Sequence, residues 1–286
     1  MYRREFHRLT LSAGISLLPG LGFAAPEKSG LWADIETSTG ARLGVAVLDT
    51  GTGALTGHRL DERFAMCSAF KWLAAAHVLR RVDQGHETLS RRVPFGRDAL
   101  LPWSPVTEKH ADGNGMTLAE LCHATVTTSD NAAANLILKT LGGPAGLTAF
   151  ARQQGDTVTR LDRWEPDLNE ALPGDERDTS SPRAMAGLLR ELVLGQALTA
   201  AGRRQLTEWL QATDTNRKRL AAGLPAGWRV GSKTGTGGQG TTNDVGVYWP
   251  PGRPPVVVAV FLTQCKASLA TREAAIARVA DAVFKT

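Results

Sequence analysis

Cysteine is scarce in this 286-residue sequence, which contains three: Cys67, Cys122 and Cys265. Their spacing matches no set of metal ligands, and an odd count in an exported chain leaves at least one free thiol or an intermolecular bridge. A buried cysteine often serves only as a small apolar side chain. We therefore expect no disulfide on which the fold depends.

The sequence also has little excess charge of either sign. The chain has 33 lysines and arginines against 28 aspartates and glutamates, a net charge of +5, and its basic run at residues 217–219 is only three residues long. This mild excess gives no reason to expect nucleic-acid binding. With 42% hydrophobic and 21% charged residues the composition is that of a globular protein, long enough for one large domain or two closely packed lobes.

Long hydrophobic runs are missing as well. The apolar segment at residues 9–25 is too short, and too interrupted by glycine and proline, to span a membrane as a helix. It follows Arg3-Arg4-x-Phe6, a pattern similar to a twin-arginine export signal. We expect cleavage near Ala24, which lowers the net charge to +3, and a periplasmic location without stable membrane association. A basic N-terminus with no targeting role is the alternative.

Strand-like and helix-like segments are unevenly distributed along the chain. Strand patterns occur at residues 42–50, 53–60, 227–235, 241–250 and 256–263, and helical periodicity at residues 68–82, 129–141, 144–154, 181–194, 199–210 and 268–284. Both ends of the chain thus supply strands, and the middle supplies helices. This order predicts one antiparallel sheet built from both ends, an inserted helical lobe, and a functional cleft between them.

One helical segment contains a lysine in an unfavourable place. Residues 70–79 are almost uniformly apolar, yet Lys71 stands in the first turn, where the macrodipole disfavours a cation, three residues after Ser68. Positions i and i+3 share a helix face, so the amine can reach the serine hydroxyl. Burial favours the neutral amine, which can accept the proton of a nucleophilic serine. Taken alone, a serine cap with a solvent-directed lysine is the simpler explanation.

Two further short motifs contain residues able to do chemistry. S-D-N at residues 129–131 begins a predicted helix, where all three residue types are favoured for local reasons. K-T-G at residues 233–235 ends a predicted strand, and a glycine-rich turn explains it when it is taken singly. A strand followed by small residues also lets a substrate lie alongside it, where lysine and threonine can meet a carboxylate.

The three motifs S-x-x-K, S-D-N and K-T-G occur in this order, with 61 residues from Ser68 to Ser129 and 104 from Ser129 to Lys233. This set is typical of class A β-lactamases and penicillin-binding proteins. The sequence resembles a class A serine β-lactamase along essentially all of its mature length. The resemblance implies a two-lobed α/β fold, with a five-stranded antiparallel sheet flanked by terminal helices and an inserted all-helical lobe. The implied division is a signal peptide at residues 1–24, an α/β lobe at residues 25–61 and 212–286, and the helical lobe at residues 62–211.

A fourth motif separates the β-lactamases from their relatives. Residues 163–178 resemble the Ω-loop of the family, in which Glu165 and Asn169 match the acid and the amide that hold one water. Arg163 and Asp178 match the ion pair that clamps the ends of this loop. Ring strain assists acylation, so release of the ester is the harder step, and a carboxylate that activates water makes it possible. A solvated loop carboxylate is the alternative for Glu165.

The resemblance also implies a role for each motif residue. Ser68 is acylated, Lys71 is its proton partner, and either Lys71 or Glu165 with its water is the acylation base. Ser129 relays the proton to the departing ring nitrogen, and Lys233 holds Ser129 and the substrate carboxylate. The remaining implied contacts are the substrate amide for Asn131, the substrate carboxylate for Thr234 and Thr236 beside Gly235, and the oxyanion for the backbone N–H groups of Ser68 and Thr236.

Arg219 and Trp103 are expected to complete the substrate site. Many members carry an arginine on the strand after K-T-G, whereas this chain has Thr241 and Thr242 there. Arg219 occupies the place from which other members supply the guanidinium, so we expect it to bind the substrate carboxylate; an exposed basic turn is the alternative. Trp103 matches an aromatic residue that walls the cleft, and ordinary partial burial is the alternative.

The cysteines depart from the family pattern. Cys122 matches a cysteine that some members bridge to the helix of the nucleophile, where this chain has Ala75. Cys67 matches a cysteine that carbapenem-hydrolysing members bridge to a residue after K-T-G, where this chain has Gly237. Neither bridge can form as in those members. Cys67 and Thr236 still resemble broad-spectrum enzymes, which favours a penicillinase with some cephalosporin activity.

Two other functions share part of this pattern. A D,D-carboxypeptidase or transpeptidase acting on peptidoglycan has the three motifs but does not need Glu165 and Asn169. A non-catalytic β-lactam sensor would be acylated and stay so, but the water-holding loop argues against it. We expect no metal, since the zinc-binding histidine clusters of metallo-β-lactamases are missing, and no organic cofactor. We also expect a monomer that acts on small-molecule β-lactams and has no nucleic-acid partner.

Overall fold

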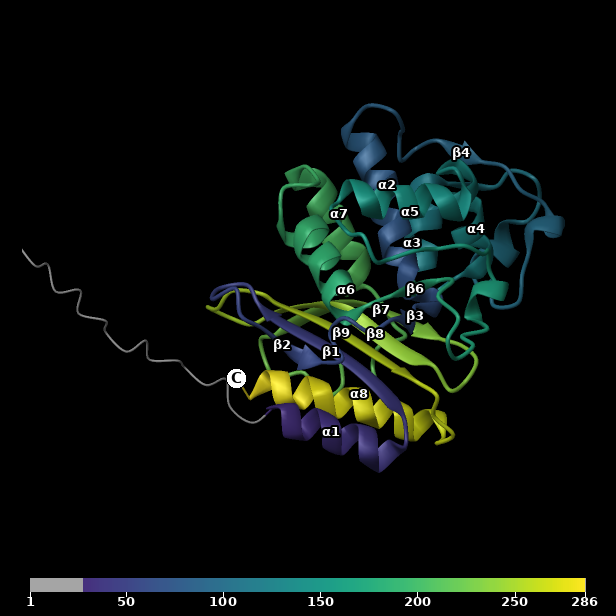
Figure 1. The fold of residues 1–286 in the computed structure, drawn as a ribbon. Helices are drawn as coiled ribbons and strands as arrows, with labels where there is room; N and C mark the ends of the chain where they lie inside the picture. The colour runs from purple at the N-terminus through teal and green to yellow at the C-terminus, as the bar shows by residue number, and fades with distance from the viewer. Residues whose placement is uncertain (1–27, 286) are drawn as a thin grey trace, which may run out of the picture.

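A computed structural model describes residues 28–285, so the predicted signal peptide and its cleavage near Ala24 lie outside the described residues. The centre of the fold is a five-stranded antiparallel sheet in the order β2-β1-β9-β8-β7 (Figure 1). Its strands are β1 (Arg42–Asp49), β2 (Leu55–His58), β7 (Arg229–Thr236), β8 (Thr242–Trp249) and β9 (Val256–Thr263). Strand β1 pairs with β9 along its whole length, from Arg42 opposite Thr263 to Asp49 opposite Val256. The predicted sheet, built from both ends of the chain, is confirmed.

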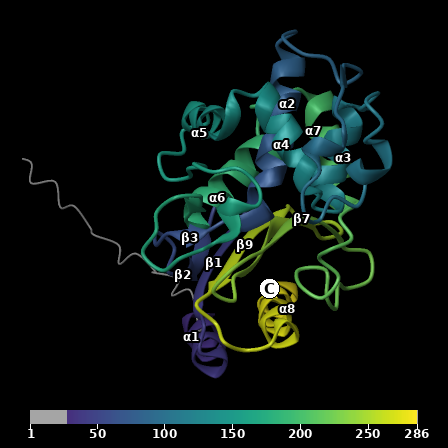
Figure 2. The ribbon, with the colours of Figure 1, turned by 90° about the vertical axis from the view of Figure 1, so that its right-hand side faces the viewer.

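Both faces of this sheet are covered. Helices α1 (Lys28–Thr39) and α8 (Leu269–Phe284) lie side by side on one face, and the helical layer lies on the other (Figures 1 and 2). Successive strand residues point to opposite faces, so Val258 of β9 packs toward α1 and α8 while Val257 packs toward the helical layer. Strand β9 is therefore apolar and buried along its entire length.

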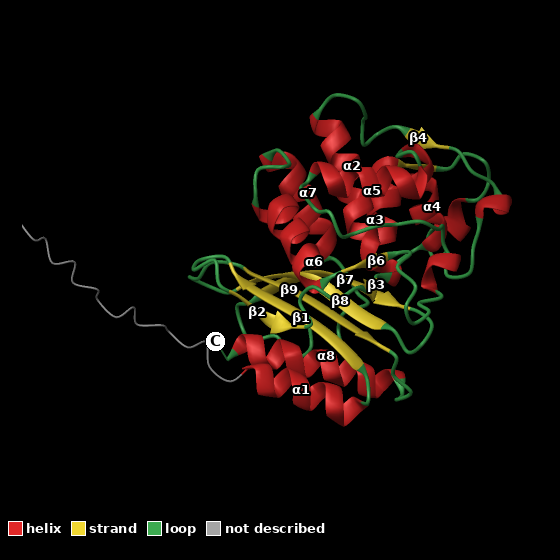
Figure 3. Cartoon of the chain, viewed as in Figure 1, coloured by secondary structure: helices red, strands yellow, loops and turns green. Residues whose placement is uncertain are grey.

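The helical layer includes one helix, residues 71–83, that contacts four of the other helices (Figure 3). Its members are α2 (Lys71–Asp83), α3 (Leu118–Thr127), α4 (Asn131–Thr140), α5 (Gly143–Gln153), α6 (Pro182–Leu189) and α7 (Ala200–Gln211). Short strand pairs join its loops: β3 (Phe64–Ala65) with β6 (Thr179–Ser180), and β4 (Arg92–Val93) with β5 (Met116–Thr117). The lobe boundaries inferred from the resemblance stay predictions. Within residues 28–285 no helix is both long enough and apolar enough to cross a membrane.

Helices α1 and α3 are absent from the helical segments that periodicity predicts. Among residues 30–39, helix α1 fully buries only Trp32 and Ile35, so its apolar stripe is too thin to stand out. Helix α3 is short, but a capping box marks its start: the Thr117 hydroxyl accepts from the Glu120 N–H, and the Glu120 carboxylate accepts from the Thr117 N–H. That T-x-x-E signal is visible in the sequence.

Candidate active site

Ser68 lies in a 3-10 turn, Cys67–Phe70, that leads directly into α2. We call this segment the nucleophile turn. Its residues are buried, and Cys67 has a left-handed backbone with φ of 44°. A non-glycine residue in this region is strained, and such strain often accompanies functional sites. The turn delivers Ser68 to the junction of the sheet and the helical layer.

Lys71 begins α2 and is fully buried. Its Nζ donates to Asn131 Oδ1 at 2.6 Å and to Ser129 O at 2.8 Å, and lies 2.9 Å from Glu165 Oε1. Burial lowers the pKa of Lys71, although the carboxylate of Glu165 acts in the opposite direction. A solvent-directed lysine is therefore excluded.

The hydroxyl of Ser68 does not use Lys71 as its partner. It donates to Glu165 Oε1 at 3.1 Å, the same oxygen that the ammonium of Lys71 approaches. Sequence reasoning expected the i, i+3 spacing to join the two side chains directly. The structure joins them through a carboxylate from a distant loop, because the burial of Lys71 calls for a counter-charge.

The loop that supplies Glu165 is fastened at both ends. Arg163 Nε donates to Asp178 Oδ2 at 2.6 Å, as the predicted ion pair requires. The amide of Asn169 donates to Glu165 Oε2, while its Oδ1 is buried without a hydrogen-bond partner among the described residues. The carboxylate of Glu165 is thus held from two sides, by Lys71 and by Asn169, and is not a solvated loop residue.

Asn135 is a functional residue that sequence reasoning missed. Its Nδ2 donates to Glu165 O at 2.9 Å and its Oδ1 accepts from the Glu165 N–H at 3.1 Å, so it clips the backbone of the loop to α4. Asn131 and Asn135 are four residues apart and share one face of α4, which points toward the site. This i, i+4 asparagine pair was the available signal.

Ser129 and Lys233 lie on the side of Lys71 away from the loop of Glu165. Lys233 Nζ donates to Ser129 Oγ at 3.0 Å and to Thr234 O at 2.8 Å, and Lys71 Nζ lies 3.5 Å from the same Ser129 hydroxyl. Burial, and then the charge of Lys71, lower the pKa of Lys233 well below its ordinary value. Ser129 is therefore shared between two buried lysines.

The middle residue of S-D-N has a structural task. Asp130 caps α4 by accepting from the Ala133 N–H at 2.9 Å, and it also accepts from the N–H groups of Val106 and Thr107. The helix-start explanation thus holds for Asp130. Asp130 anchors the loop before it, whereas Ser129 and Asn131 face the site.

Strand β7 forms the edge of the site. Gly235 permits a close approach, because a Cβ there would lie 2.5 Å from Met66 O in front of the nucleophile turn. The Thr234 and Thr215 hydroxyls are 2.7 Å apart, and Thr215 is a second residue that the sequence analysis did not select. Threonines in a loop carry no distinctive signal.

Arg219 is almost completely buried, with 4% of its surface exposed. Its Nη1 donates to Asn243 O at 2.9 Å and to Gly235 O at 3.1 Å, and its Nη2 donates to Thr236 Oγ1 at 2.8 Å. Glu273 lies 3.4 Å from its Nε. Burial lowers the pKa of the guanidinium. The exposed-turn alternative is therefore wrong, and the guanidinium lies beside Thr236 at the edge of the site.

Trp103 lies at the rim with 65% of its surface exposed, so ordinary partial burial does not describe it. Its indole N–H donates to Thr128 O at 3.0 Å, and its backbone oxygen accepts from the Asn131 N–H. The cavity below it has a volume of about 420 Å³. Its lining comprises Ser68, Trp103, Ser129, Asn131, Asn169, Thr215, Arg219, Thr234, Thr236 and Leu269.

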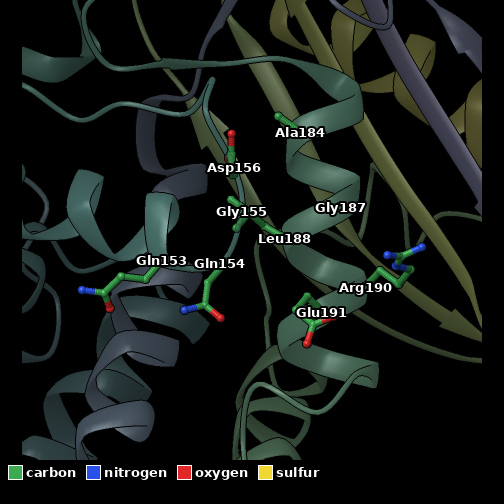
Figure 4. Close-up of a pocket in the computed structure, with 9 residues that line it drawn as sticks. All are labelled: Gln153, Gln154, Gly155, Asp156, Ala184, Gly187, Leu188, Arg190 and Glu191. Atoms are coloured by element: carbon green, nitrogen blue, oxygen red, sulfur yellow. The ribbon is translucent and has the colours of Figure 1, made fainter.

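A second hollow of about 330 Å³ lies between the end of α5 and α6 (Figure 4). It is lined by residues such as Gln154, Asp156 and Glu191 and contains none of the predicted site residues. All three cysteines are buried and unpaired. Within residues 28–285 no three His, Cys, Asp or Glu side chains gather in a way that could hold a metal ion. Eight of the predicted residues line the first cavity, and Lys71, Glu165 and Lys233 form hydrogen bonds with residues that line it.

The chain is similar to proteins of one family. The family profile described as "Beta-lactamase enzyme family" matches residues 31–286. "Carbapenem-hydrolyzing beta-lactamase KPC" of Klebsiella oxytoca is 51% identical over 261 residues, covering 90% of this chain and 88% of the relative. "Beta-lactamase CTX-M-8" of Citrobacter amalonaticus is 46% identical over 288 residues, covering 99% of each chain. The solved structure of an ancestral (GNCA) class A β-lactamase is 61% identical, with a TM-score of 0.88 over 90% of this chain and 98% of that chain.

Proposed function

Because the chain belongs to the class A β-lactamases and hydrolyses β-lactams as an enzyme of that class, EC 3.5.2.6, we propose that Ser68 is its nucleophile and Glu165 its deacylating base. Small-molecule β-lactams are the substrates, and their hydrolysis confers antibiotic resistance. One observation carries the proposal: Ser68 Oγ and Lys71 Nζ meet at a single oxygen of Glu165, at 3.1 and 2.9 Å.

In the proposed acylation step, Ser68 Oγ attacks the β-lactam carbonyl carbon and the ring C–N bond breaks. The serine proton leaves through Lys71, or through a water on Glu165, and Ser129 delivers a proton to the departing nitrogen. The 3.5 Å approach of Lys71 Nζ to Ser129 Oγ supports this relay, as does the bond from Lys233. The backbone N–H groups of Ser68 and Thr236 are the proposed oxyanion hole.

In the proposed deacylation step, Glu165 takes a proton from a water that attacks the ester of Ser68. Asn169 supports this role because its amide nitrogen orients Glu165 and its buried oxygen has no partner among the described residues, so it can accept from that water. The Arg163–Asp178 pair keeps both groups in place by closing the loop.

Substrate recognition is assigned to groups around the same cavity. Arg219, Thr234 and Thr236 bind the substrate carboxylate, with the charge of Lys233 behind them and Gly235 between the threonines. Asn131 Nδ2 donates one hydrogen to Pro102 O, and its other hydrogen binds the side-chain amide of the substrate. Trp103 walls the entrance. We assign the enzyme to penicillins and some cephalosporins, and to the periplasm as a monomer exported by residues 1–24.

The experiment that tests the proposal is intact-protein mass spectrometry during reaction with excess benzylpenicillin. Wild type is expected to form product rapidly with no lasting adduct, whereas Glu165→Gln is expected to retain an adduct on Ser68. Asp167→Asn is the matched control, since this exposed carboxylate lies on the same loop two residues away and is expected to behave as wild type.

The other outcomes identify the competing functions. A lasting adduct on both wild type and Glu165→Gln would mean a penicillin-binding protein or a sensor, and the role assigned to the loop would be wrong. An adduct that maps to a residue other than Ser68 would overturn the nucleophile. Rapid turnover by Glu165→Gln would remove Glu165 as the deacylating base.

A further inference from the structure

Asn243 lies in the middle of the sheet, on β8, opposite Gly235 of β7 and Phe261 of β9. Its side chain is fully buried, and none of the roles given above uses it. A buried amide has to find hydrogen-bond partners, because leaving its polar atoms unpaired is costly. Two of the three partners of the Asn243 side chain lie outside the five-stranded sheet.

The side-chain nitrogen of Asn243 donates to the two backbone carbonyls that immediately precede the nucleophile turn in sequence. The acceptors are Ala65 O and Met66 O, each at 2.9 Å. The side-chain oxygen accepts from the Leu262 N–H at 3.4 Å, within the sheet. One amide thus connects the sheet to the peptide units that lead into Ser68.

These carbonyls lie where the backbone is strained. Met66 O belongs to the peptide unit that enters Cys67, the residue with φ of 44°. A non-glycine residue in this region is strained, and the conformation persists only where the surroundings determine it strongly. Met66 O accepts from both Asn243 Nδ2 and the Ala69 N–H, so the amide fixes the peptide on one side of the strained residue. The direction of the following N–H, that of Ser68, depends on this peptide.

The same residue also defines the opposite side of the site. Asn243 faces Gly235 across the β7–β8 pair, and its backbone oxygen shares Arg219 Nη1 with Gly235 O. Gly235 lets β7 pass so close to the turn that a Cβ would lie 2.5 Å from Met66 O and 3.1 Å from the Ala69 nitrogen. Thr236 follows directly on β7. Asn243 therefore contacts β7 and the two residues just before the nucleophile turn, which are the segments next to the two N–H groups of the proposed oxyanion hole.

We infer that Asn243 is a positioning residue of the oxyanion hole: by holding Ala65 O and Met66 O against the sheet, it sets the spacing between the N–H groups of Ser68 and Thr236. This inference rests on the oxyanion hole of the proposed function. A pair of donors helps only when both reach the developing oxyanion at hydrogen-bond distance, so a small displacement of the turn reduces the rate while leaving the side-chain machinery intact.

The test compares wild type with Asn243→Leu, which keeps the branched shape and the number of side-chain heavy atoms but donates nothing. We expect kcat/KM for benzylpenicillin to fall by roughly tenfold to a hundredfold. The inhibition constant of phenylboronic acid, whose tetrahedral adduct on the serine places an oxygen in the hole, should rise by the same factor. In a Glu165→Gln background, the infrared band of the acyl-enzyme ester carbonyl should move to higher frequency, because weaker donors polarise the carbonyl less.

Thr241→Val is the matched control. It removes a buried hydroxyl contact to Thr263, 2.7 Å long, just before the same strand, without touching the nucleophile turn. It should lower the free energy of unfolding but leave the ester band and the boronate affinity unchanged. If Asn243→Leu does not fold, Asn243→Ala is measured in the same way, because it removes the amide without adding apolar bulk.

The outcomes separate this inference from the one it rests on. An unchanged ester band and unchanged boronate affinity in Asn243→Leu, with loss of stability alone, would overturn the role of Asn243 and leave the proposed function standing. If no ester forms on Ser68 even in the Glu165→Gln background, the proposed function fails and the inference falls with it.

Discussion

Lys71 Nζ and Glu165 Oε1 lie 2.9 Å apart, and both side chains are completely buried. Removing one member of such a pair leaves an uncompensated charge in the interior, which is far more costly than losing an exposed ion pair. Because the hydroxyl of Ser68 donates to the same oxygen, the proton of the nucleophile and the charge of the lysine are governed by one carboxylate. Substitutions of these three residues will therefore not be additive.

Lys71→Arg tests whether a neutral amine is needed. Burial lowers the pKa of Lys71, so wild-type acylation should rise as pH increases through that lowered value and the neutral amine accumulates. A guanidinium stays protonated, so the variant should lose this rise and acylate about 10²- to 10⁴-fold more slowly. Stopped-flow acylation by a chromogenic cephalosporin between pH 5 and 9 measures both effects. Lys109→Arg, at an exposed site, is the control, and a wild-type pH profile in Lys71→Arg would exclude the amine as a base.

Arg219→Ala should weaken the recognition of the substrate carboxylate. A charge-assisted hydrogen bond contributes about 1.5–3 kcal/mol, so kcat/KM should fall roughly tenfold to a hundredfold, mainly through KM. Steady-state kinetics with benzylpenicillin gives the measurement. Arg217→Ala removes an exposed arginine from the same short run and should change neither constant. Unchanged KM and kcat in Arg219→Ala would rule out the assigned contact.

Gly237→Ala should disturb the loop that holds the deacylating base. A Cβ at Gly237 would lie 2.6 Å from Asn169 O and 2.5 Å from Cys67 Sγ, so the loop or the turn must shift. We expect the free energy of unfolding to fall by about 1–3 kcal/mol and the acyl-enzyme to accumulate as a kinetic burst. Gly187→Ala, where a Cβ meets nothing within 4 Å, is the control. Burst-free turnover at the wild-type rate would contradict the expected coupling.

Asp244→Asn should change how stability depends on pH. Burial raises the pKa of Asp244 from 3.8 to about 6, and the charged groups that act on it are Arg219 and Lys233. Between these values the folded state binds more protons than the unfolded state, so the wild-type free energy of unfolding falls as pH rises. Relative to Asp244→Asn, wild type should be about 2 kcal/mol more stable at pH 4 than at pH 7. Urea unfolding of both proteins at the two pH values measures this difference, and a pH-independent difference would contradict the shift.

The parts of the fold that could be predicted are those in which a pattern continues over many residues. Strand β9 is apolar from Val256 to Leu262 and β1 from Leu43 to Leu48, and turns rich in glycine and proline separate the sheet strands. Helix α1, in contrast, fully buries Trp32 and Ile35 alone among its residues 30–39, and its apolar stripe is too thin for periodicity to reveal. Tertiary packing against α8 stabilises it, and such a partner cannot be read from one segment.

The candidate site likewise divides into residues that belong to contiguous motifs and residues that do not. S-x-x-K, S-D-N, K-T-G and the loop around Glu165 are contiguous motifs, so their residue types and order were visible in the sequence. Asn135, Thr215 and Asn243 are single polar residues within helical, loop and strand segments. Their importance lies in partners that are distant in sequence, as Asn243 and Met66 are, with a sequence separation of 177.

The pairing of β1 with β9 has a consequence for the time at which activity arises. The partner of Arg42 is Thr263, so β1 cannot pair with β9 until the ribosome has synthesised the residues between them. Closure over such a separation is slow compared with local folding. The chain therefore has to be nearly complete before Lys233 and Arg219 can come to stand beside Ser68. A truncated chain that ends before residue 256 lacks the strand that closes the sheet, so premature termination yields no partly active enzyme.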